Sequence, residues 1–257
     1  MNAPASPPSP TPGAEAGAAL CIVAALSLEL RPLLRRATHL SLVPSPQGAW
    51  VWQGLLGGRP VLIVRSGMGA RGVARVLPVL DALDLSAVVS VGACAALKDG
   101  LGQGDVVAAE RVVSEEGASF VCAAPMLKAV GEAGVKAHRG ALACSGHVLS
   151  EPALKRELHR RCGALAADME SAHLAAYAKR RGLPFAALKV VSDEAGCWMP
   201  PLDARGWLAH PLWRALRLPR YLGGLLRVAK GWPKVREGLE AAALALERLS
   251  ASGSLRP

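Results

Sequence analysis

The sequence predicts a single α/β domain, and three observations support this fold class. The chain has 257 residues, which is long enough to bury a substantial core within one domain. About half of the residues are hydrophobic but few are aromatic, so the interior should consist mainly of Ala, Val and Leu. Between Ala164 and Glu194, a helical pattern is followed directly by an apolar run that is typical of a buried parallel strand.

The predicted helix of this stretch is bounded at both ends. Asp168 and Glu170 precede it, where acids suit the partial positive charge of a helix N-terminus. Residues Lys179 to Arg181 place basic charge in its last turn. Gly182 can cap the C-terminus, and Pro184 blocks any continuation of the helix.

The strand that follows should lie in the centre of the sheet. It covers Phe185 to Val191 and is interrupted only by Lys189, before ending in Ser192, Asp193 and Glu194. Ligands of open α/β sheets collect beyond the carboxyl ends of the strands, which makes Asp193 a candidate for chemistry. The alternative for an acid at this position is a turn or capping role.

The N-terminal part begins with a segment, Met1 to Ala18, that is rich in Pro, Ala, Ser and Gly and contains no basic residue. It lacks the positive region of a signal peptide, and we expect a disordered tail. Residues Leu20 to Leu26 are then predicted to form the first buried strand. Residues Ser27 to Arg36 are predicted to form a short helix that carries Glu29.

A hairpin and a glycine-rich turn come next. Residues Trp50 to Leu56 and Pro60 to Arg65 are predicted strands joined by a Gly-Gly pair. A turn then leads into a helix that begins near Arg71. Its glycines allow a ligand to approach the backbone, although an ordinary strand-to-helix turn would use the same residues. The turn consists of Ser66, Gly67, Met68 and Gly69.

Four further elements are predicted in the rest of the chain. Residues Ala87 to Val91 form a buried strand that leads into Gly92, and Gly104 to Ala109 and Arg139 to Cys144 form two more strands. Residues Glu237 to Leu249 have helical periodicity and are expected to close the domain.

Composition excludes several classes of protein. No apolar run reaches the roughly 18 residues of a transmembrane helix. The six cysteines are scattered without a CxxC pair or a metal-site spacing with histidine. We therefore expect reduced thiols in a cytoplasmic protein, without a metal ion or a cofactor.

The positive charge is mostly regional. Of the net charge of +10, a net of +7 comes from eight basic residues and one acid between Asp203 and Arg236. No nucleic-acid-binding pattern accompanies it, so an anionic membrane surface is the expected partner, through an interfacial helix. A basic flap packed over the domain is the alternative. The segment from Cys197 to Arg236 also contains four tryptophans, Trp198, Trp207, Trp213 and Trp232.

Several motifs together resemble a known superfamily. The sequence DMES at 168–171 and VVSDEA at 190–195 occur with the strand leading to Glu29, the SGMG turn at 66–69, and VGACAAL and QGDVV between Val91 and Val107. The set resembles the purine nucleoside phosphorylase and methylthioadenosine/adenosylhomocysteine nucleosidase superfamily, whose members cleave N-glycosidic bonds. Within it, the chain is most similar to the hopanoid-associated phosphorylases, a branch linked to removal of adenine from adenosylhopane.

The resemblance implies a fold, an assembly and a substrate. It implies a three-layer domain over residues 19–257, with a central mixed sheet flanked by helices and an insertion at 197–236. It also implies a homodimer that binds a small nucleoside, which could be linked to a lipid. The activity would release adenine from an adenine nucleoside.

The resemblance also assigns roles to residues. Asp193 would protonate the purine at N7, Glu170 would hold the ribose hydroxyls, and Glu29 would position water. Burial at the end of an apolar strand would help Asp193 to hold its proton. The residues expected to contact substrate are Met169, Ser66, Gly67, Gly69, Gly92, Ala93 and Ser192.

The chain departs from the family pattern at the expected phosphate site. Ala93 replaces a serine, and Ala95 and Ala96 replace paired glycines. Ser90 stands where related phosphorylases place an arginine that binds phosphate. These substitutions favour hydrolysis over phosphorolysis. Two alternatives remain open: a nucleosidase or phosphorylase for soluble substrates such as methylthioadenosine and adenosylhomocysteine, and a nucleoside-binding protein without catalysis.

Overall fold

The computed structural model describes residues 18–45, 49–200 and 211–252, so almost all of the expected N-terminal tail lies outside the described residues. The strands are β1 (Ala19–Ala24), β2 (Thr38–Val43), β3 (Trp50–Leu56), β4 (Arg59–Arg65), β5 (Leu85–Ala96), β6 (Val106–Val113), β7 (Ser119–Val121), β8 (Ala137–Cys144), β9 (Ala166–Asp168) and β10 (Phe185–Asp193). The helices are α1 (Ser27–Arg36), α2 (Gly69–Asp81), α3 (Ala124–Glu132), α4 (Pro152–Cys162), α5 (Ser171–Arg180) and α7 (Pro211–Ser252).

The strands form one mixed sheet with part of it closed on itself. Strand β1 pairs in parallel with β4 and β5, and the sheet continues from β4 through β3 to β2. On the other side, β5 pairs with β10, β10 with β6, β6 with β8, β8 with β9, and β9 again with β5. These five pairings complete a ring. A ring has no free edges, so each of its strands is hydrogen-bonded to a neighbour on both sides, which fixes its register.

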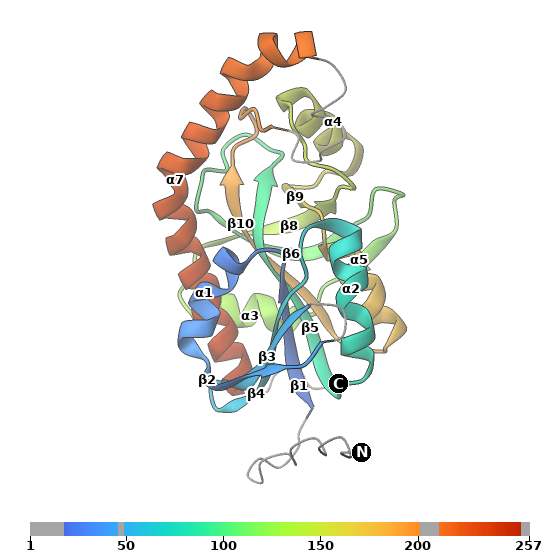
Figure 1. The fold of residues 1–257 in the computed structure, drawn as a ribbon. Coiled ribbons are helices and arrows are strands. Elements are labelled where there is room, and N and C mark those ends of the chain that lie inside the picture. The colour runs from blue at the N-terminus through green and yellow to red at the C-terminus, as the bar shows by residue number, and fades with distance from the viewer. Residues whose placement is uncertain (1–17, 46–48, 201–210, 253–257) are drawn as a thin grey trace, which may run out of the picture.

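Helices cover both faces of the sheet (Figure 1). Helices α1, α3 and α7 pack on one face, where the apolar side of α7 meets β10. Helices α2 and α5 pack on the other face. The α/β fold class, with a mixed sheet between two helical layers, is therefore confirmed. Each face has its own core of mainly Ala, Val and Leu side chains.

Some local elements have the predicted bounds, whereas β5 and β6 extend beyond the predicted ranges of Ala87 to Val91 and Gly104 to Ala109. Helix α1 coincides with the predicted segment, β3 and β4 form the predicted hairpin, and α5 ends at Arg180 with Gly182 in a left-handed conformation (φ 66°). Five elements were not predicted, namely β2, β7, β9, α3 and α4. Pro152 at the first turn of α4 and Gly163 (φ 66°) after its last turn explain where that helix begins and ends.

The C-terminal helix differs most from the prediction. Residues Glu237 to Leu249 are helical, but they form only the end of α7, a helix of 42 residues. Its first part contains most of the basic residues of the predicted insertion, and residues 201–210 lie outside the described part of the chain. Among the described residues, no helix is long and apolar enough to cross a membrane.

Candidate active site

A cavity of about 240 Å³ opens where β1, β5 and β10 end, and four buried carboxyl groups line it. One of them, Asp168, is paired with Lys189. The other three are the cavity acids Glu29, Glu170 and Asp193, which are 5%, 7% and 5% exposed. The three acids come from separate elements: α1, the start of α5 and the end of β10. The rest of the wall is largely apolar and includes Leu26, Met68, Leu149, Met169, Met199 and Trp232.

Backbone amides hold Glu29 in place. One carboxylate oxygen accepts a hydrogen bond from the Leu26 N–H (2.8 Å), and the other accepts one from the Ala93 N–H (2.7 Å). Gly92 has a φ of 125°, and a Cβ at this position would lie 2.8 Å from the Glu29 carboxylate. Only glycine fits there without moving the acid. Burial raises the pKa of Glu29, although these hydrogen bonds and a nearby lysine oppose the shift.

Glu170 occupies the N-cap position of α5. Its carboxylate accepts a hydrogen bond from the Gly69 N–H (2.6 Å), which connects the glycine-rich turn to the wall of the cavity. Burial, followed by repulsion from the Asp168 carboxylate, raises the pKa of Glu170 to about 7. The group therefore changes its charge near neutral pH.

A buried ion pair lies behind these two acids. The Lys189 ammonium is 2.8 Å from the Asp168 carboxylate and donates to the Val91 carbonyl oxygen (3.0 Å). Ser171 donates both its N–H and its hydroxyl to the same carboxylate. Burial alone would lower the pKa of Lys189, but Asp168 and two further carboxylates raise it. A permanent positive charge is thus fixed under the cavity.

A second buried lysine contacts Asp193. The Lys155 ammonium, on α4, donates to one Asp193 carboxylate oxygen, to the Glu194 carbonyl oxygen (2.8 Å) and to the Cys197 carbonyl oxygen (3.2 Å). The other Asp193 oxygen lies 2.7 Å from the Ser192 hydroxyl. Lys155 is 0% exposed and lies behind Asp193 as seen from the cavity. The acid expected to hold a proton therefore faces a cation.

Sequence reasoning did not find Lys155, although a signal existed. Lys155, Leu158 and Cys162 are spaced three and four residues apart along α4, so they share one helical stripe. The two apolar members pack against a small core cluster. A lysine on the apolar stripe of a helix indicates a buried cation, which requires a counter-ion. The sequence shows that Lys189 interrupts an apolar strand, but it does not indicate that Asp168 is the partner of this lysine.

The predicted contact residues fall into three groups. Met169, Ala93 and Ser192 line the cavity itself. Gly69 and Gly92 lie behind it and fix the carboxylates of Glu170 and Glu29. Ser66 and Gly67 line a neighbouring pocket instead. The wall also includes Trp232 of α7, which sequence reasoning had placed in a membrane-binding segment.

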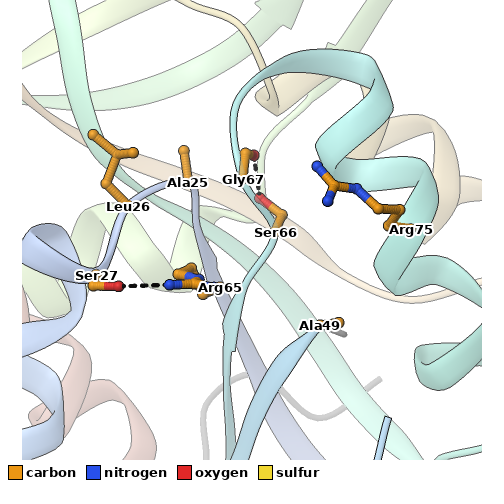
Figure 2. A pocket seen from close by; sticks show the side chains of 8 residues that line it. All are labelled: Ala25, Leu26, Ser27, Ala49, Arg65, Ser66, Gly67 and Arg75. Atoms are coloured by element: carbon orange, nitrogen blue, oxygen red, sulfur yellow. Dashed lines mark hydrogen bonds between the residues drawn. The ribbon is translucent and has the colours of Figure 1, made fainter. Parts of the chain in front are cut away.

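The neighbouring pocket, of about 260 Å³, shares Ala25 and Leu26 with the cavity (Figure 2). Its basic groups are Arg65, which donates to the Ser27 hydroxyl (3.1 Å), and Arg75 of α2. Both guanidinium groups belong to this pocket and neither lines the cavity that holds the three acids. Ser90, at the position where the sequence resemblance implies a phosphate-binding arginine, is fully buried and bonded to Ser171 (3.0 Å).

The arrangement supplies acids on different sides of one apolar cavity. A carboxyl group at each side of a scissile bond is the arrangement that glycoside-cleaving enzymes use to protonate a leaving group and to direct a nucleophile. Among the described residues, no cluster of His, Cys, Asp and Glu could hold a metal ion.

Comparison with solved structures gives the same fold at low identity. The 5′-methylthioadenosine/S-adenosylhomocysteine nucleosidase of Neisseria meningitidis, solved with methylthio-immucillin-A, is 16% identical (TM-score 0.73; 91% of this chain and 99% of that chain). The S-adenosylhomocysteine nucleosidase of Streptococcus pyogenes is 18% identical (TM-score 0.71; 93% and 99%). Futalosine hydrolase of Helicobacter pylori is 15% identical (TM-score 0.69; 90% and 97%).

The family of the chain follows from a match to a family model. No curated protein sequence matches the chain significantly. The family model described as the phosphorylase superfamily matches residues 19–205, which include all three cavity acids and both buried lysines. The chain therefore belongs to the phosphorylase superfamily, whose enzymes act on N-ribosyl bonds.

Proposed function

We propose that this protein cleaves the N-glycosidic bond of an adenine nucleoside with water and releases adenine. The observation that carries the proposal is the convergence of Glu29, Glu170 and Asp193, each buried, on one cavity of about 240 Å³. The similar structures support it, because their names describe them as nucleosidases and as a futalosine hydrolase.

In the proposed reaction, the bond between C1′ and N9 breaks and its electron pair moves into the purine. Asp193 delivers a proton to N7, so the base leaves as neutral adenine. The sugar becomes cationic at C1′, and the Glu170 carboxylate on its hydroxyls stabilises that charge. Water held by Glu29 adds to C1′, and its proton passes to the Glu29 carboxylate. The raised pKa of Glu29 suits this role, because the group accepts a proton more readily than an exposed glutamate.

Water is favoured over phosphate for electrostatic reasons. The Glu29 carboxylate lies beside the Ala93 amide, where an incoming phosphate would meet a negative charge. Ser90 bonds to Ser171 inside the core and so is not offered to a ligand. The basic groups nearest to the cavity, Arg65 and Arg75, line the neighbouring pocket. Mass analysis of the sugar formed in phosphate buffer tests the point, since a phosphorylated sugar would contradict it.

The substrate that we propose carries a large apolar 5′ substituent, as adenosylhopane does. The apolar wall formed by Met68, Leu149, Met199 and Trp232 favours such a group, as does the resemblance of the sequence to the hopanoid-associated branch. Methylthioadenosine and adenosylhomocysteine are the second candidates, favoured by the names of the similar structures.

The experiment compares adenine release from adenosylhopane, methylthioadenosine and adenosylhomocysteine, with and without phosphate. Faster turnover of adenosylhopane supports the first candidate, and faster turnover of a soluble nucleoside supports the second. Binding of the nucleosides without any adenine release would contradict the enzymatic proposal and would indicate a nucleoside-binding protein.

We also propose that the first part of α7 brings the protein to an anionic membrane. Leu222, Leu225 and Leu226 are 49%, 42% and 61% exposed and lie on one side of the helix. Exposed basic residues, including Arg227 and Lys230, lie on a flank of the same helix. Exposed leucines beside basic residues are typical of helices that lie in a membrane interface.

Replacing the three leucines with serine should reduce co-sedimentation with anionic vesicles several-fold and leave cleavage of a soluble nucleoside nearly unchanged. Neutral vesicles, and anionic vesicles at high salt, serve as controls because salt screens the attraction of the basic flank. Equal vesicle binding by the variant and the parent would show that this helix face has another partner.

A further inference from the structure

The contacts of Lys155 specify its charge state. A protonated lysine has three N–H donors and no acceptor. Its Nζ has three acceptors in reach: the Asp193 carboxylate and the carbonyl oxygens of Glu194 and Cys197. A neutral amine would offer only two donors and would turn a lone pair toward an oxygen. The three acceptors therefore fit an ammonium ion, which carries a full positive charge at 0% exposure.

A buried ammonium ion needs a buried counter-ion, since an unpaired charge in an apolar interior is strongly destabilising. Among the described residues, no acidic side chain other than Asp193 contacts Nζ. The resting pair therefore consists of an ammonium and a carboxylate. This result conflicts with the simple assignment of Asp193 as an acid that waits with its own proton.

Other titratable groups near the pair do not replace this counter-ion. Burial raises the pKa of the Cys197 thiol, and Asp193 raises it further, so the thiol stays neutral. Burial likewise raises the pKa of the Cys94 thiol on β5 well above its usual value. Glu194, after β10, and Arg227, on α7, are exposed, so solvent screens their charges.

We propose that Lys155 is a positioning residue for Asp193 and holds, in the resting protein, the proton that Asp193 delivers to the purine. The inference rests on the proposed function, because it names the source of the proton in that reaction. Lys155 acts only through Asp193, which separates it from the cavity.

The proton movements balance. As the C1′–N9 bond breaks, N7 takes a proton from the Asp193 carboxyl, and one proton leaves the Lys155 ammonium for the same carboxyl. Lys155 becomes a neutral amine, and adenine leaves as a neutral base. Water adds to C1′ and gives its proton to Glu29. After adenine has left, solvent entering the cavity carries a proton back through Asp193 to Lys155.

The hydroxyl of Ser192 can follow this change. It lies 2.7 Å from an Asp193 oxygen and 3.1 Å from the Cys94 carbonyl oxygen, and it has one hydrogen to donate. It donates to Asp193 while that group is a carboxylate. When the Asp193 oxygen holds a proton, the hydroxyl can turn to Cys94 and accept that proton's hydrogen bond. Asp193 therefore has Ser192 as a hydrogen-bond partner both as a carboxylate and as a neutral carboxyl group.

The test is the pH profile of adenine release by Lys155→Met, a variant of similar length without charge. Without the cation, buried Asp193 must keep its own proton to act as an acid. At acidic pH the variant should retain turnover within a few-fold of the parent. As the pH rises, the turnover of the variant should fall about tenfold per pH unit, while the parent continues to turn over. Lys128→Met, at an exposed lysine on α3, should follow the parent throughout.

Two results would overturn the inference. One is a loss of turnover by Lys155→Met that is equal at every pH, which indicates a purely structural lysine. The other comes from a nucleoside methylated at N7, whose purine is already cationic and needs no proton. On that substrate the pH-dependent loss should disappear, and its persistence would show that Lys155 does not act on protonation.

A measurement on the unaltered protein keeps the inference testable if the variant does not fold. The carboxyl carbon resonance of Asp193, assigned with Asp193→Asn, should report an ionised group at pH 7, and a protonated group would refute the ion pair. If the parent releases no adenine from any nucleoside, the proposed function fails, whereas this resonance still decides the charge state of the pair.

Discussion

Replacing Glu170 with glutamine should stabilise the protein while it impairs the reaction. Burial raises the pKa of Glu170 from 4.5 to about 7. One pH unit between these two values corresponds to about 1.4 kcal/mol, so ionising this carboxyl in the folded protein opposes folding by on the order of 3 kcal/mol. Glutamine keeps an oxygen for the Gly69 N–H and removes the charge.

The pH dependence gives the sign of the effect. Because the folded protein binds this proton more tightly, the carboxyl's contribution to stability is complete below pH 4.5 and is lost as the pH rises through about 7. The test is urea unfolding of Glu170→Gln and the parent at pH 4.5 and pH 8. At pH 4.5 the two proteins should have similar free energies of unfolding. At pH 8, Glu170→Gln should be more stable by up to about 3 kcal/mol. Glu237→Gln, at an exposed position, should show no such difference.

The activity of Glu170→Gln should be lower than that of the parent, although its stability is higher. The parent's kcat/KM should rise as the pH increases through about 7, because the ionised Glu170 supports the cationic sugar. Glu170→Gln should lose this rise and most of its turnover. A stability difference that is independent of pH would refute the reasoning, since it would show that the folded protein does not oppose ionisation of Glu170.

Three further predictions concern the same cavity. Asp193→Asn should lose adenine release by roughly two to four orders of magnitude, as expected for a missing general acid. It should also unfold at lower temperature, since the Lys155 cation loses its counter-ion, and the double variant with Lys155→Met should regain stability in a melting experiment without regaining activity. Gly92→Ala should lower kcat at least tenfold, because the new Cβ would lie 2.8 Å from the carboxylate it faces. Gly100→Ala, at a similarly positive φ but with nothing within 4 Å, separates backbone strain from this contact, and equal losses in both variants would count against the prediction. Trp232→Ala should raise the KM for a nucleoside with a large apolar 5′ group more than that for methylthioadenosine, and steady-state kinetics on both substrates decide it.

Local sequence signals predicted the elements whose ends are specified by nearby residues. Helix α5 has acids before it and Gly182 and Pro184 after it, and α1 and the hairpin of β3 and β4 are equally local. Strand β2 was missed because none of its side chains is buried, so no buried apolar run marks it. The closure of the ring through β9, a strand of three residues, depends on pairing between distant segments and has no local signal.

The acids of the site could be predicted, whereas their electrostatic partners could not. Glu29, Glu170 and Asp193 occur in the motifs that carry the family resemblance, and the family model matches the range that contains them. The pairing of Lys155 with Asp193 joins residues 38 positions apart on different elements. The position of Lys155 on the apolar stripe of α4 indicates burial, but only packing identifies the acid that it contacts.

The ring of strands has a consequence for biosynthesis. Strand β5 ends at Ala96, but its partner β10 begins only at Phe185, so a chain emerging from the ribosome presents an unpaired β5 edge for much of its synthesis. The cavity acids follow the same order, because Glu29 emerges early and Asp193 late. Pairing across such a sequence separation is slow, and exposed strand edges invite association between chains. Chains truncated before β10 should therefore aggregate rather than accumulate as partly folded monomers.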